Sequence, residues 1–131
     1  MVEYINPASM HANPAYTQAV LIPANARTLL IGGQNAVGKD GAIVGKGDLA
    51  AQSRKAIENL LACLQEAGGT LENLVHVTIS FKGDVDIMPG YKEWAAVWGQ
   101  RPNPPAVSAA KVVGLAHPDF LIEISGVAVL P

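Results

Sequence analysis

The sequence contains little cysteine, little charge and no long apolar run, and each shortage argues against a class of protein. Its one cysteine, Cys63, cannot form a disulfide within the chain. The nine lysine and arginine residues are scattered, and the formal net charge is −2. We predict no nucleic-acid partner, because a phosphate backbone calls for a basic surface. No apolar run reaches the roughly 20 residues that cross a bilayer, so we also predict no membrane partner.

Other recognisable signals are missing as well. The N-terminal residues lack the basic start and the apolar core of a signal peptide, so the cytoplasm is the expected compartment. The histidines His11, His76 and His117 show no metal-ligand spacing, and the glycines lack the spacing of a dinucleotide or phosphate-binding loop. We therefore predict neither a metal ion nor a cofactor.

Apolar residues are what the sequence has in quantity. Half of its 131 residues are hydrophobic and 15% are charged, and the mean hydropathy is +0.24. This composition indicates one folded domain over residues 1–131 with a sizeable core. A domain of this size buries only about two-thirds of its unfolded surface, so we expect further copies of the chain to cover part of the apolar remainder.

Turn residues and hydrophobic periodicity divide the chain into strands and helices. We predict strands at 17–22, 28–31, 75–82, 106–113 and 120–130, helices at 48–67 and from Pro89 to Gly99, and a proline-rich loop at 100–105. The turn at Pro23–Ala26 predicts a hairpin between the first two strands. A further strand at the N-terminus would bring the sheet to about six strands. The fold class is therefore α+β, with both helices on one face of a mixed sheet.

The first predicted helix is amphipathic. Its apolar residues recur at spacings of three and four, whereas its polar face is assigned Gln52, Arg54, Lys55, Glu58 and Glu66. Asp48 is the expected N-cap and Gly68 the expected end. Cys63 lies within this helix and needs no role beyond packing.

The second predicted helix carries an aromatic stripe. Tyr91, Trp94, Ala95 and Trp98 follow one another at i, i+3, i+4 and i+7 and so share one face. That face either packs against the sheet or forms a platform for a ligand.

A series of short motifs resembles the Rid/YjgF family of reactive intermediate deaminases, in order and over nearly the whole chain. The motifs are Asn13–Ala19, Gly32–Gln34, Gly47–Leu49, Ala67–Gly69, Leu74–Thr78, Tyr91, Pro105–Ser108 and Ile122–Ile124. The resemblance implies a chorismate-mutase-like fold and a homotrimer in which three sheets form a central β-barrel. It also implies small-molecule sites in the clefts between subunits.

One departure from the family concerns the substrate anchor. Family members that hydrolyse 2-imino acids hold the substrate carboxylate with an arginine in a Pro-Ala-Arg-Ser motif, whereas this chain has Val107 at that position. Valine cannot donate a hydrogen bond or carry charge. Met88 and Ala109 make the neighbouring family positions apolar as well. Arg101 is the only basic residue close enough in sequence to swing into the place of the family arginine. The alternative is that Arg101 is a solvated charge of the loop.

The remaining positions that the family uses are kept. Tyr16 and Glu123 occupy such positions and are the candidate catalytic residues. For Glu123 there is also a physical reason, because burying a carboxylate in an apolar strand costs free energy unless the group has a hydrogen-bond partner or takes up a proton. A carboxylate in that environment can activate water. The alternatives are subunit contact for Glu123 and packing for Tyr16. The candidate ligand-binding residues are Gly32, Gly33, Gln34, Met88, Tyr91, Arg101, Val107, Ser108 and Ala109.

Two classes of function remain open. The first is a Rid-type hydrolase for a small imine or enamine that is not anchored by a carboxylate, and the second is a non-catalytic metabolite-binding module. A 2-imino acid deaminase is disfavoured by Val107, and an endoribonuclease by the charge. A hydrolase triad is disfavoured because no serine occupies a nucleophile elbow.

Overall fold

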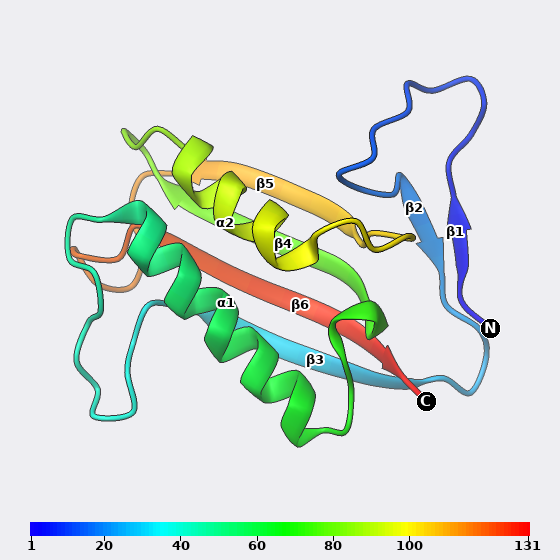
Figure 1. The fold of residues 1–131 in the computed structure, drawn as a ribbon, viewed down its shortest axis with the longest axis horizontal. Coiled ribbons are helices and arrows are strands. Elements are labelled where there is room, and N and C mark those ends of the chain that lie inside the picture. Colours follow the sequence, from blue (N-terminus) through cyan, green and yellow to red (C-terminus); the bar gives the residue numbers. More distant parts are fainter.

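The computed structural model describes all 131 residues, and in it two helices cover one face of a four-stranded sheet (Figure 1). The strands are β1 (Glu3–Ile5), β2 (Ala19–Leu21), β3 (Arg27–Gln34), β4 (Leu74–Lys82), β5 (Ala106–Val112) and β6 (Ile122–Leu130). The helices are α1 (Leu49–Glu66) and α2 (Met88–Trp98), with a short 3-10 helix at Leu71–Asn73. This α+β arrangement confirms the predicted fold class. No helix combines the length and apolarity of a membrane span.

The four-stranded sheet has the order β3-β6-β4-β5. β4 and β5 run parallel and are joined by a crossover through α2, whereas β6 is antiparallel to both of its neighbours. The last strand of the chain is thus one of the two central strands. β3 and β5 are the two edges.

The predicted hairpin between β2 and β3 is wrong. β2 pairs with β1 in a separate two-stranded ribbon beside the main sheet, and β3 pairs with β6 (Figure 1). The six strands therefore form two sheets. Pairing with β6 places Ile31 of β3 in the core beneath the helices, where it is 5% exposed, and the three-residue β2 is too short to give β3 such a partner.

Alternation along the strands separates the two faces of the sheet. On the side that the helices cover, β4 contributes Val77, Ile79 and Phe81 to the core, and β6 contributes Ile122 and Ile124. The opposite side, called the open face below, carries the residues between them.

The open face is partly apolar. The polar members of this face include His76, Thr78 and Ser80 of β4 and Glu123 and Ser125 of β6. Leu30 of β3 pairs with Val127 of β6 on the same face, and Leu30 is 76% exposed. The rest of the chain thus leaves most of the Leu30 side chain and part of Val127 uncovered.

α1 begins and ends as predicted. The Asp48 carboxylate accepts a hydrogen bond from the backbone N–H of Ala51 at 3.1 Å. Gly68 follows the C-terminus with φ +83, a conformation that favours glycine.

The assignment of Gln52 to the polar face of α1 is wrong. Gln52 is fully buried, its amide nitrogen donates to the carbonyls of Gly45 and Asp119, and its oxygen accepts from the N–H of Leu121 at 2.9 Å. The side chain thus satisfies backbone groups of two segments that form no regular structure, which is why a polar residue points inward.

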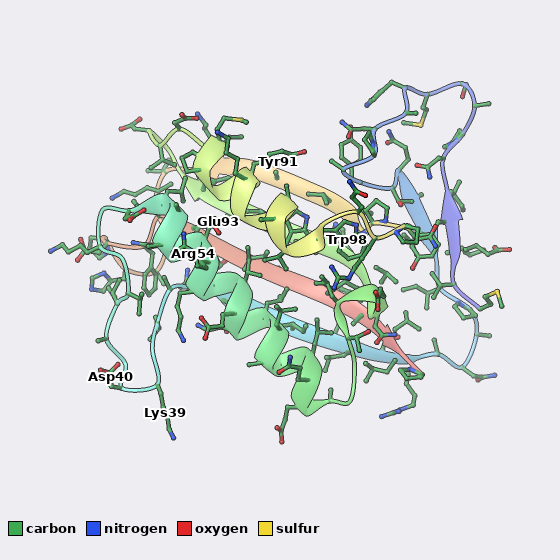
Figure 2. The ribbon with its side chains drawn as sticks, viewed as in Figure 1. Lys39, Asp40, Arg54, Tyr91, Glu93 and Trp98 are labelled. Atoms are coloured by element: carbon green, nitrogen blue, oxygen red, sulfur yellow. The ribbon has the colours of Figure 1, made fainter.

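α1 and α2 approach closely at Gly90. A Cβ there would lie 2.8 Å from Phe81 and 3.0 Å from the hydroxyl of Ser53. Nearby, Arg54 and Glu93 form an ion pair of 2.8 Å between the two helices (Figure 2). The hydrogen bonds that Arg54 donates to the Glu93 carboxylate raise the pKa of the Arg54 guanidinium.

Candidate functional site

An apolar cavity of about 330 Å³ lies between α2 and the helix-covered side of β4 and β5. Four of the predicted site residues line it, namely Tyr16, Tyr91, Val107 and Ala109. The five other lining residues are also apolar: Ala15, Ile79, Phe81, Ile87 and Trp94. The cavity therefore holds no charged group of this chain.

Strand register explains why Val107 and Ala109 face this cavity. They lie beside Val77 and Ile79 in the parallel pairing of β5 with β4, and so point toward the helices. Ser108 lies between them and points to the open face, where its hydroxyl is 3.0 Å from Nε2 of His76. Ser108 therefore does not line the cavity.

The N-terminal segment carries Tyr16 to the cavity. Thr17 donates from its backbone N–H to the Pro105 carbonyl at 3.2 Å and from its hydroxyl to the Pro104 carbonyl. These bonds fix the segment next to the start of β5. The hydroxyl of Tyr16 is 2.9 Å from Nε2 of His11, a contact with no signal in the sequence pattern.

Glu123 lies in a different place, on the open face beside the glycines of β3. The pairing of β3 with β6 is irregular between Ile31 and Gln34. Here Gly33 approaches Glu123 so closely that a Cβ on residue 33 would be 2.5 Å from the carboxyl carbon. Gln34 donates from its side chain to the Gly32 carbonyl at 3.2 Å.

One copy of the chain thus holds two separate groups of predicted site residues. Val107 and its neighbours face the helices, whereas Glu123 and Gly33 meet on the open face. The sheet itself lies between the two groups. A site that uses both of them needs residues from two copies.

Met88 and Arg101 join neither group. Met88 begins α2 and is not part of the cavity lining. The Arg101 guanidinium bonds to Glu72 at 3.2 Å and to the backbone carbonyls of Val97 and Trp98 at 3.1 and 2.8 Å. These partners hold it against the end of α2, so it does not supply the missing cation in this structure.

The aromatic stripe of α2 serves in packing and also borders the cavity. Trp94 and Trp98 are each 5% exposed and stack with ring centroids 6.1 Å apart. Trp94 also lines the cavity. Helical spacing is the sequence pattern that could have identified Trp94 as a lining residue. Strand alternation is the corresponding pattern for Ile79 and Phe81. No group of three potential metal-ligating side chains lies together.

Comparison with known proteins finds relatives that match most of the chain. The family model described as endoribonuclease L-PSP matches residues 7–130. A RutC family protein of Pyrococcus abyssi is 30% identical over 113 residues, which cover 86% of this chain and 84% of that protein.

Solved structures extend the likeness to the fold. The Yersinia pestis protein YyfB, described as a conserved Rid family protein of unknown function, is 31% identical with a TM-score of 0.86 over 98% of both chains. The YjgF gene product of Escherichia coli is 28% identical, with a TM-score of 0.71 over 88% of this chain and 91% of that one. The family match over almost the full length, together with these likenesses in sequence and fold, shows that the chain belongs to the Rid/YjgF family.

Proposed function

We propose that this protein hydrolyses a small imine or enamine without a carboxylate, at sites built between two copies of the chain. The observation that carries the proposal is the apolar cavity around Val107, which offers no cation to an acidic substrate. Moving an ionised carboxylate into such surroundings costs several kcal/mol when nothing pairs with it. A neutral substrate avoids this cost.

The separation of the two residue groups supports a site shared between copies. In the proposed assembly, the cavity of one copy adjoins Glu123 and Gly33 of the next. Leu30 and Val127 leave apolar surface on the open face, and β5 leaves an unpaired strand edge. Both features favour contact with further copies. A homotrimer around a barrel of sheets, as in the family, would cover them.

The proposed reaction adds water across the C=N bond. Glu123 accepts a proton from the water while the water oxygen bonds to the imine carbon. Glu123 then passes that proton to the imine nitrogen. The product of this addition is a carbinolamine; its hydroxyl proton then passes by way of Glu123 to the nitrogen as the C–N bond breaks, which releases ammonia and a carbonyl compound. The backbone N–H of Gly33 polarises the substrate, and Tyr16 closes the cavity over it. No cofactor enters this scheme.

A matched pair of imines tests the proposal. An amino acid oxidase acting on phenylalanine releases an imine with a carboxylate, and an amine oxidase acting on phenethylamine releases the corresponding imine without one. Semicarbazide traps both imines and reports how long each survives. We expect the protein to speed hydrolysis of the neutral imine alone. Acceleration of the acidic imine alone would contradict the proposal.

The same cavity also supports a second candidate, a non-catalytic binding module. The observation that favours it is the lining, in which no carboxylate, histidine or lysine is present and the two tyrosines, Tyr16 and Tyr91, offer the only hydroxyl groups. Neutral amides are stable mimics of the planar imine. Saturable binding of phenylacetamide without acceleration of either imine would identify a binding module.

A further inference from the structure

A second, smaller cavity adjoins the one around Val107. Its volume is about 210 Å³, and it shares Ala15, Tyr91 and Trp94 with the first cavity. Ala95 and Trp98 line the second cavity only. The two cavities therefore follow each other along α2, beneath the same N-terminal segment.

The positions on α2 give this groove its direction. Tyr91 lies one turn before Trp94 and Ala95, and Trp98 lies one further turn along the same face. Figure 2 shows Tyr91 and Trp98 near opposite ends of the helix. A molecule with its reactive end beside Val107 can extend past Trp94 toward Trp98.

The size of each cavity limits what it can hold. Sites for drug-sized ligands usually measure about 300–1,000 Å³, so the first cavity, at about 330 Å³, lies at the lower limit. The second, at about 210 Å³, is too small to be such a site by itself. It has room for one end of a ligand that is held elsewhere.

We propose that the second cavity binds an aromatic tail of the same ligand, so that the substrate class is an arylalkyl imine or enamine. This inference rests on the proposed function for the cavity around Val107. The stacked rings of Trp94 and Trp98 present aromatic surface to the tail. Aromatic groups pack well against such surface by offset stacking or edge contact. The indole N–H of Trp98 is already bonded to the Arg101 carbonyl at 2.9 Å, which fixes the ring.

A series of neutral amides tests the tail site by calorimetry. Phenylacetamide, 3-phenylpropanamide and 4-phenylbutanamide have the same head and differ in the reach of the ring. Each added methylene that becomes buried strengthens binding roughly threefold to fourfold. We expect affinity to rise along the series as the ring enters the second cavity.

Two neighbouring alanines of α2 provide a matched pair of variants. Ala95 lines the second cavity and Ala96 does not, and both are exposed, so that neither replacement disturbs the core. Ala95→Leu should remove the additional affinity of 4-phenylbutanamide over phenylacetamide and leave the affinity for phenylacetamide unchanged. Ala96→Leu should leave the whole series unchanged.

Tryptophan fluorescence gives a second readout, because the chain has only two tryptophans. In Trp98→Phe, Trp94 is the sole reporter. Trp94→Phe leaves Trp98, which lines only the second cavity. We expect 4-phenylbutanamide to change the emission of Trp98 more than phenylacetamide does.

The outcomes separate the two proposals. Equal affinity along the series, or loss of phenylacetamide binding in Ala95→Leu, would overturn the tail site and leave the proposed function standing. If no amide binds at all, both proposals are overturned.

Discussion

The carboxyl group of Glu123 lies directly against the backbone of Gly33. A Cβ on residue 33 would be 2.5 Å from the carboxyl carbon and 2.8 Å from one of its oxygens. The adjacent Gly32 differs, because a Cβ there would meet nothing within 4 Å. Of two consecutive glycines, only the second one leaves space for the acid.

These glycines supply a matched pair of variants. Gly33→Ala should push the Glu123 carboxyl aside, cost about 1–3 kcal/mol of unfolding free energy through overpacking, and reduce turnover of the neutral imine at least about tenfold. Gly32→Ala should leave turnover within about twofold, since its added methyl group meets no atom of this chain. Thermal unfolding and the semicarbazide assay provide the readouts. Equal losses in the two variants would contradict this account of Gly33.

The proposed role of Glu123 predicts a specific loss in Glu123→Gln. The amide keeps the shape of the side chain but cannot take a proton from water, so turnover should fall by about 100-fold or more. Phenylacetamide binding and the unfolding temperature should change little. Ser125→Ala, on the same strand and the same face, is the control. Unchanged turnover in Glu123→Gln would exclude the residue as the base.

Restoring a guanidinium should change which ligands bind. In Val107→Arg, affinity for phenylacetate should rise by about tenfold or more, because a charge-assisted bidentate pair replaces an unpaired carboxylate. Val107→Met adds length without charge and should show no such rise. Calorimetry with phenylacetate and phenylacetamide measures both effects. If phenylacetate binds the unaltered chain as well as phenylacetamide does, Val107 does not select neutral ligands.

The buried Gln52 predicts a large loss of stability. Gln52→Leu would leave the carbonyl of Asp119 and the N–H of Leu121 without partners, which should cost about 2–4 kcal/mol. Gln65→Leu, at an exposed position of the same helix, should change the unfolding free energy by no more than about 0.5 kcal/mol. Denaturant titrations of both variants would check this. Similar stabilities would mean that these hydrogen bonds contribute little.

Much of the fold could be predicted from the sequence, because local signals fix its elements. Asp48 and Gly68 mark the two ends of α1 through their capping roles, and the alternation of apolar and polar residues identified β4. Strand pairing could not be read in this way. The turn after β2 suggested a local hairpin, but the partner of β3 is the distant β6, because burying Ile31 depends on tertiary packing that no local motif reports.

The candidate site was predictable residue by residue but not as an arrangement. Resemblance to the family pointed to Val107 and Glu123, and the structure places them on opposite faces of the sheet. That outcome depends on the order and register of β5 and β6. Gln52 was misassigned because helical periodicity carries no information about backbone groups that need a buried partner.

The proposal depends most on a site that exists only between copies, and native mass spectrometry with a saturating neutral amide tests this directly. We predict that 4-phenylbutanamide is found on a trimer of about 41 kDa, three times the 13.7 kDa chain, with one ligand per chain. The amide should be absent from any monomer. If the monomer binds as much ligand per chain as the trimer does, the site is not shared between two copies.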